Sequence, residues 1–155
     1  MTQFNFRFQK ILELKENEKG VAQVQMADAI KKEQAGHQKS RAITDKLVEA
    51  EQMKREKQLG GINIAELRML EMYISQLQEQ YSMSNRELEF LQGNVSRSQN
   101  QLQQKAQEQK TWGNLKEQEL GKFQEEKKIE EQNFFDELAS ARFYRIKQAN
   151  TAERG

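Results

Sequence analysis

The sequence predicts an all-α protein, an antiparallel two-helix coiled-coil hairpin with a helical overhang at its C-terminal end. Among 155 residues, 32% are charged, 35% are hydrophobic and none is proline, a composition typical of long helices and too poor in apolar side chains for a wide globular core. One glycine pair, at positions 60 and 61, interrupts the chain. On both sides of that pair, selected positions repeat at alternating spacings of three and four, as in a heptad.

The first helix is expected over residues 4–59. Its heptad positions, which we call the first seam, hold many small residues and alone would make a poor helix interface. This helix therefore needs larger side chains from a partner. The first seam comprises Ala22, Met26, Ala29, Glu33, Gly36, Ser40, Ile43, Leu47, Ala50 and Lys54.

A turn is predicted over residues 60–63. Gly60 is expected to adopt the left-handed conformation that ends a helix. Asn63 can cap the following helix, and Ile62 and Leu67 flank that cap as a hydrophobic staple. Signals for a helix end and a helix start therefore coincide here.

The second helix is expected over residues 64–148. Its heptad positions, the second seam, are apolar at ten of fourteen places, which indicates a coiled-coil interface. The second seam comprises Leu67, Leu70, Ile74, Leu77, Tyr81, Ser84, Leu88, Leu91, Val95, Ser98, Leu102, Lys105, Gln109 and Trp112.

The two seams match when paired residue numbers sum to 124, and the midpoint of that register is residue 62, inside the predicted turn. Small residues then tend to face large ones, as interdigitating side chains require. We therefore expect a single coiled-coil domain over residues 1–155. The predicted pairs are Ala50–Ile74, Leu47–Leu77, Ile43–Tyr81, Ser40–Ser84, Gly36–Leu88, Ala29–Val95, Ala22–Leu102, Leu12–Trp112 and Phe4–Leu120.

The same register predicts an overhang. The first helix has no residues to pair beyond about residue 121, so some 27 residues of the second helix should project by about 40 Å. Phe123 and Phe134 are eleven residues apart, a step that relaxes left-handed supercoiling. This spacing suits a helix that has left its partner.

The charge pattern argues against several classes of protein. The 25 basic and 24 acidic residues are interleaved and leave a net charge of +1, whereas a nucleic-acid binder normally presents a positive face. The absence of cysteine excludes disulfides and thiolate metal sites. Neither a membrane span nor the apolar core of a secretory signal is evident. We expect a cytosolic protein without direct membrane insertion and without a nucleic-acid partner.

No constellation of residues indicates catalysis. His37 is the only histidine, in a polar stretch without a second histidine or an adjacent carboxylate. Gly60 and Gly61 lack the further glycine and the lysine of a phosphate-binding loop. We expect no enzyme activity, no catalytic residues, no cofactor and no metal site.

Apolar residues off the seams indicate where partners bind. Four aromatic side chains fall within eleven residues of the overhang, and exposed clusters of this kind usually mark contact sites. The alternatives are homodimerisation or packing against Phe4, Phe6 and Phe8. The predicted protein-binding residues are Phe134, Phe135, Leu138, Arg142 and Phe143.

A second off-seam group lies close to the turn. Met69, Met72 and Tyr73 are adaptable contact residues when exposed. Their spacing is equally compatible with isolated apolar side chains on the surface that bind no partner.

The N-terminal sequence from Phe4 to Lys15 resembles the opening of the flagellar export protein FliJ family. The segment from Glu125 to Leu138, followed by Arg142 and Phe143, resembles the tail of that family. The turn falls where the family has its hairpin, and the resemblance covers nearly the whole chain. The adjacent Phe134 and Phe135 depart from the more polar residues expected there.

This resemblance implies a non-enzymatic stalk or adaptor of the flagellar type III export apparatus, similar in form to the central stalk of rotary ATPases. It implies a cytoplasmic protein held at the membrane through the apparatus. The implied partners are a hexameric export ATPase, which the end with both termini should enter, a membrane-embedded export gate, and export chaperones. We expect the gate contact at Met69, Met72 and Tyr73, because they are apolar, off the seam and near the turn. The alternative is a generic cytosolic coiled-coil scaffold.

Overall fold

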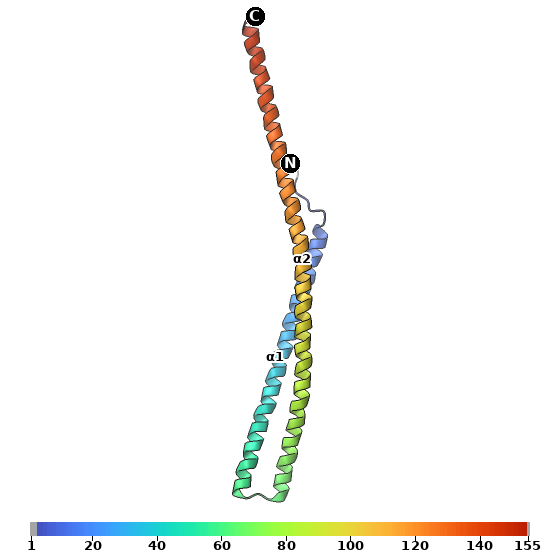
Figure 1. The fold of residues 1–155 in the computed structure, drawn as a ribbon, viewed down its shortest axis with the longest axis vertical. Coiled ribbons are helices and arrows are strands. Elements are labelled where there is room, and N and C mark those ends of the chain that lie inside the picture. Colours follow the sequence, from blue (N-terminus) through green and yellow to red (C-terminus); the bar gives the residue numbers. More distant parts are fainter. Residues whose placement is uncertain (1–2, 155) are drawn as a thin grey trace. The chain divides into compact units, whose positions relative to one another are not determined.

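The computed structural model of the chain describes residues 3–154; Met1, Thr2 and Gly155 lie outside the described residues. It contains two helices, α1 from Gln9 to Gly60 and α2 from Ile64 to Arg154, of 52 and 91 residues. Residues 3–154 include no strand. The helices pack against each other as a two-helix hairpin (Figure 1), which confirms the predicted fold class.

The chain divides into two compact units. The hairpin unit is Glu16–Gln107, and the terminal unit is Met1–Lys15 together with Glu108–Gly155. Each unit contains a part of α1 and a part of α2. The expectation of a single domain over residues 1–155 stays a prediction.

The core of the hairpin unit lies along the two predicted seams. Ala50, Ile74 and Leu77 form a buried cluster with Leu47 packed against it, which agrees with the predicted register. The largest side chains of this cluster come from both helices, and Ala50 leaves room for them. The buried residues of this unit all occupy predicted seam positions: Ala22, Ala29, Ile43, Ala50, Ile74, Leu77 and Ser84.

At Gly36 the two helices come close together, because this residue of α1 has no side chain. A Cβ atom placed there would lie 3.0 Å from Leu91 Cδ1 and 3.3 Å from Leu88 Cδ1. The small residue therefore receives two leucines of the other helix, as the register predicts for Leu88. Tyr81, by contrast, is 37% exposed although it occupies a seam position, since its long ring can reach past the seam to water.

The turn differs from the prediction in one residue. Gly60 is the last residue of α1, and Gly61 carries the left-handed conformation with φ of 84°. Asn63 caps α2 as predicted: its side-chain oxygen accepts a hydrogen bond from the Ala65 amide at 3.4 Å. The Leu67 amide donates to the Asn63 carbonyl at 3.0 Å. The helix end thus moved by one position because either glycine tolerates a positive φ.

Ion pairs flank the seam of the hairpin unit. Lys105 Nζ lies 3.2 Å from Glu18 Oε2, and Lys39 Nζ lies 3.3 Å from Glu87 Oε2. The Glu18–Lys105 pair is the better buried of the two, with side chains about 30% exposed, at 31% and 28%. It joins α1 and α2 where the seam position itself is polar.

The N-terminal residues of the terminal unit are not helical as far as was predicted. Helix α1 begins at Gln9 rather than at residue 4, and its first turn is preceded by a hydrogen bond from the Gln9 amide to the Phe6 carbonyl at 3.2 Å. Residues 3–6 have neither helix nor strand. Phe6 is nevertheless buried, with 5% of its surface exposed.

The aromatic residues of this N-terminal segment depart from the predicted register in opposite directions along α2. The ring of Phe8 contacts Trp112 at a centroid distance of 5.5 Å, and the ring of Phe4 contacts Phe123 at 5.5 Å. Leu120 was the predicted partner of Phe4. The register pairs residue 8 with residue 116, so Phe8 packs earlier in α2, and Phe4 packs later in α2, than predicted. A non-helical chain rises by about 3.3 Å per residue and a helix by about 1.5 Å, so residues 4–8 span more of α2 than four helical residues would.

The overhang is longer than predicted. Helix α2 continues to Arg154 instead of ending near residue 148. Phe123 is still half-buried, and residues 124–154 are exposed throughout. We call residues 124–154 the tail. Its 31 helical residues span about 46 Å.

Candidate partner-binding surfaces

The tail is an unpartnered helix with a high content of exposed apolar residues. Every apolar side chain larger than alanine in it has more than half of its surface exposed, and the largest value is 67% at Phe143. A soluble helix of this length normally buries one face. These residues are Ile129, Phe134, Phe135, Leu138, Phe143, Tyr144 and Ile146.

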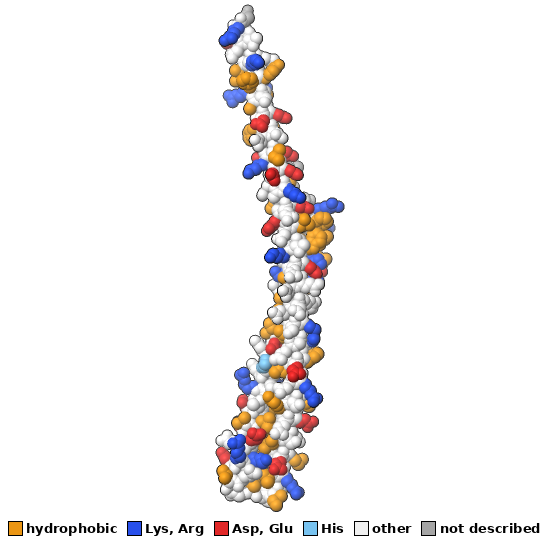
Figure 2. Space-filling view, in the orientation of Figure 1, with side chains coloured by type: hydrophobic (Ala, Val, Ile, Leu, Met, Phe, Trp, Pro, Cys, Tyr) orange, Lys and Arg blue, Asp and Glu red, His pale blue; other side chains and the backbone are white. Residues whose placement is uncertain are grey.

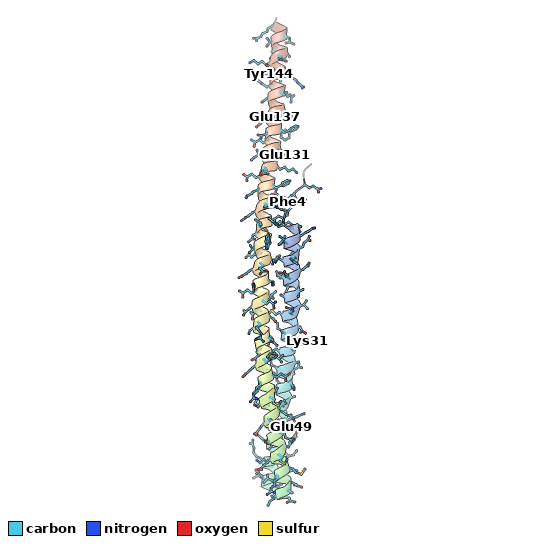
Figure 3. The ribbon with its side chains drawn as sticks, turned by 90° about the vertical axis from the view of Figure 1, so that its right-hand side faces the viewer. Phe4, Lys31, Glu49, Glu131, Glu137 and Tyr144 are labelled. Atoms are coloured by element: carbon cyan, nitrogen blue, oxygen red, sulfur yellow. The ribbon has the colours of Figure 1, made fainter. Side chains whose placement is uncertain are left out.

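The N-terminal phenylalanines do not cover the tail. Phe4 contacts Phe123, Phe8 contacts Trp112, and Phe6 contacts Phe8. In Figure 3 the Phe4 side chain points to α2 before the tail begins, and Glu131, Glu137 and Tyr144 lie farther along the helix. The alternative in which the tail aromatics pack on this N-terminal segment is therefore wrong.

Helical spacing divides the predicted tail residues between two sides. Phe134, Leu138, Ala141 and Arg145 follow at intervals of four, three and four and form one stripe, which we call the tail stripe. Phe135 and Arg142 border it, and the rings of Phe134 and Phe135 are 6.1 Å apart.

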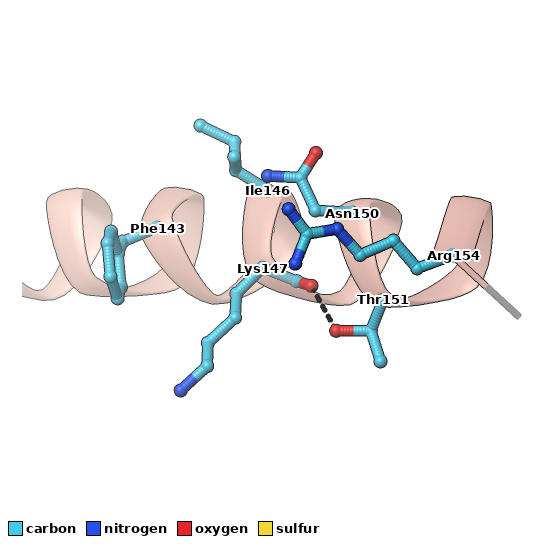
Figure 4. A pocket seen from close by; sticks show the side chains of 6 residues that line it. All are labelled: Phe143, Ile146, Lys147, Asn150, Thr151 and Arg154. Carbon is cyan, nitrogen blue, oxygen red and sulfur yellow. Dashed lines mark hydrogen bonds between the residues drawn. The ribbon is translucent and has the colours of Figure 1, made fainter.

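Phe143 lies on the other side of the tail. It is nine residues, or two and a half turns, beyond Phe134. Its neighbours there include Ile146, Lys147 and Arg154, which line a shallow hollow on the surface of a single helix (Figure 4). The Thr151 hydroxyl donates to the Lys147 carbonyl at 2.7 Å in the same hollow. The predicted residues thus do not form one continuous patch.

The prediction omitted Tyr144 and Ile146, which are 64% and 53% exposed. The sequence could have indicated that Tyr144 and Ile146 are exposed, because both lie beyond the last residue of α2 that the first helix can cover. Phe123 was assigned to the free overhang, but it is the residue on which Phe4 packs. That contact depends on the non-helical N-terminal segment, which the heptad pattern does not predict.

The predicted residues near the turn are exposed and adjacent. Met69, Met72 and Tyr73 have 73%, 65% and 46% of their surface exposed, and their spacing of three and four places them on one side of α2. We call these three residues the turn patch. Leu59 and Ile64, which the prediction did not include, are 91% and 69% exposed beside the turn.

The structure places the single histidine beside a carboxylate. His37 Nε2 lies 3.4 Å from Glu33 Oε1 four residues earlier in α1, so the expectation of no adjacent carboxylate was wrong. This is an ordinary pair on a helix surface, with the His37 side chain 49% exposed. Within residues 3–154 no group of three or more His, Asp or Glu side chains is placed to hold a metal ion.

Neither helix, over the residues described, is both long and apolar enough to cross a membrane. The model of the family described as "Flagellar FliJ protein" matches residues 4–148. No curated protein and no solved structure matches the chain.

Proposed function

Because the chain belongs to the flagellar FliJ protein family and is thereby a component of the flagellar export apparatus, we propose that it is a non-enzymatic stalk of that apparatus. In this role it engages the hexameric export ATPase through the tail and the export gate through the turn patch. The protein is cytoplasmic and associates with the membrane only through these partners.

The observation that carries this proposal is the exposure of the tail. A helix that packs against its own chain up to Phe123 and then continues for about 46 Å without cover needs a partner for its apolar side chains. Phe134, Phe135 and Leu138 offer apolar contact, and Arg142 offers a guanidinium group, a combination common at the energetic centres of interfaces. Phe143, on the other side, gives the tail apolar contacts in two directions.

The turn patch supports the contact with the export gate. Methionine and tyrosine side chains adapt to a partner surface and are enriched at interface centres. These three residues belong to the hairpin unit, whereas the tail belongs to the terminal unit. Export chaperones are further candidates for the exposed apolar residues of the hairpin.

Removal of the tail tests the proposal. A chain that ends after Gln124 should lose binding to the purified export ATPase and lose stimulation of ATP hydrolysis, and it should stay helical because its paired segments are intact. Emission from Trp112, the only tryptophan, reports whether the N-terminal segment still docks. Full stimulation by the truncated chain would place the ATPase contact elsewhere, and binding of neither ATPase nor gate by the full chain would favour a generic scaffold.

A further inference from the structure

The tail stripe continues the face of α2 that the N-terminal segment covers. Phe134 is eleven residues, or just over three whole turns, beyond Phe123. The two residues therefore point to the same side of the helix, although Phe123 is packed against Phe4 and Phe134 is 58% exposed. This side of α2 is therefore covered by the N-terminal segment at Phe123 and exposed to solvent at Phe134.

The tail stripe is also complementary to itself when one copy is reversed. Its intervals of four, three and four read the same in both directions. If two antiparallel tails pair so that residue numbers sum to 279, Leu138 of each copy faces Ala141 of the other, and Phe134 faces Arg145. A large side chain then meets a small one, and a guanidinium group meets an aromatic face.

The pairing in which residue numbers sum to 279 also matches the length of the tail. In it, residue 154 of one copy lies opposite residue 125 of the other. The overlap therefore covers residues 125–154, and the tail that is free of the N-terminal segment is residues 124–154. The end of the second copy would stop just before Phe123, which Phe4 already covers.

The charges of the tail favour the same antiparallel arrangement. Residues 125–139 contain six acidic and two basic side chains, a net charge of −4, and residues 140–154 contain one acidic and four basic side chains, a net charge of +3. Figure 2 shows the basic side chains gathered toward the C-terminal end of the tail. An antiparallel pair places opposite signs together, and a parallel pair would place like signs together.

We propose that the tail binds the tail of a second copy of this chain, antiparallel, through the tail stripe. The contact is isologous and closes with two copies. Its stripe overlaps the proposed ATPase contact, so one tail cannot serve both at once. That consequence rests on the proposed function, whereas the pairing itself does not.

Two matched variants of the purified full chain test the pairing by sedimentation equilibrium. Leu138→Asp, within the stripe, should raise the dimer dissociation constant at least about tenfold, a change of about 1.4 kcal/mol. Ile129→Asp makes the same change in charge at a residue of similar exposure, 53% against 51%, on the opposite side of the helix. It should leave the dimer intact. A chain that is monomeric at all concentrations, or equal loss of the dimer in both variants, would overturn the proposal.

Disulfide trapping tests the register, because the chain has no cysteine of its own. A mixture of Lys127→Cys and Ala152→Cys chains should form a disulfide between the two kinds of chain, since those numbers sum to 279. Lys127→Cys alone should form none, because the two copies of residue 127 lie about 37 Å apart in this register. Rapid trapping of Lys127→Cys alone would indicate parallel tails and would refute the antiparallel contact.

Discussion

The ring of Phe8 lies against the indole of Trp112 with their centroids 5.5 Å apart and the planes inclined by 62°. The same Phe8 ring contacts Phe6 at 6.0 Å, and the Phe8 carbonyl accepts a hydrogen bond from the Leu12 amide at 3.0 Å. One residue therefore joins the first turn of α1, the non-helical segment before it and helix α2. The N-terminal segment covers α2 up to Phe123, on which Phe4 packs, and the exposed tail begins at the next residue.

We predict that Phe8→Ala releases the N-terminal segment. Truncation should destabilise the terminal unit by about 1–3 kcal/mol, since the ring loses both burial and two edge-to-face contacts. Emission of Trp112 should move to longer wavelength as its ring meets water. Phe90→Ala, at a phenylalanine that is 64% exposed in the hairpin unit, is the control and should change neither emission nor Tm. An unshifted spectrum in Phe8→Ala would contradict the observed docking.

The register of the hairpin predicts a disulfide pattern. Cysteines at Leu47 and Leu77 should crosslink within one chain, because both residues belong to the core cluster of the hairpin unit. A pair at Leu47 and Leu102 should remain reduced. Electrophoresis without reductant separates the two outcomes, and efficient crosslinking of the second pair alone would refute the register.

Much of the fold was predictable because two signals in the sequence are local and repetitive. The seams predicted the buried positions of the hairpin unit, including polar Ser84, since a heptad fixes which side of a helix meets its partner. The capping side chain of Asn63 predicted the start of α2. Both signals depend on residues within one or two helical turns of each other.

The remaining features depend on contacts that periodicity does not describe. The heptad pattern extends a helix to residue 4, but the aromatic contacts of Phe4 and Phe8 favour a more extended chain that reaches Phe123. The sequence groups Phe143 with Phe134 as aromatic residues of one segment, yet nine residues of helix turn Phe143 to the other side. The functional partners of the turn patch and the tail remain predictions, because exposure identifies a contact surface without identifying its partner.

The Glu18–Lys105 ion pair should make a measurable contribution to the hairpin unit. Glu18→Lys places two like charges side by side and should destabilise the fold by up to about 1 kcal/mol, as expected for a partly exposed pair. Adding Lys105→Glu should restore much of the loss, because the reversed pair recreates the attraction. Thermal melts of the parent chain, the two single variants and the double variant form the cycle. Additive losses in the double variant would mean that the pair has no coupling.

We predict that Met69→Asp combined with Tyr73→Asp weakens binding to the export gate and reduces flagellar export. Helicity and Tm should stay nearly unchanged, because both side chains are exposed. Met83→Asp combined with Phe90→Asp adds the same charge at exposed apolar residues of α2 farther from the turn, and serves as the control. Unaltered swimming and gate binding in the first variant would remove the turn patch from the proposal.

The opposite placement of Phe134 and Phe143 distinguishes two ways in which the tail can meet the ATPase. A ring that surrounds the helix contacts both sides, so Phe134→Ala and Phe143→Ala should each weaken ATPase binding or stimulation. A partner with a single groove contacts one side, so one of the two substitutions would be silent. Truncation of an aromatic residue at an interface centre typically costs about 2 kcal/mol or more, which is roughly thirtyfold in affinity.

Ile129→Ala is the control for these two variants, because it also shortens a half-exposed apolar side chain of the tail but lies closer to the N-terminal segment. All three chains should keep the circular dichroism and Trp112 emission of the parent, since residues 124–154 are exposed. ATPase stimulation is then measured across a range of chain concentrations. Loss in both phenylalanine variants supports insertion into a ring, loss in one supports a one-sided contact, and loss in neither would exclude the tail aromatics from the ATPase contact.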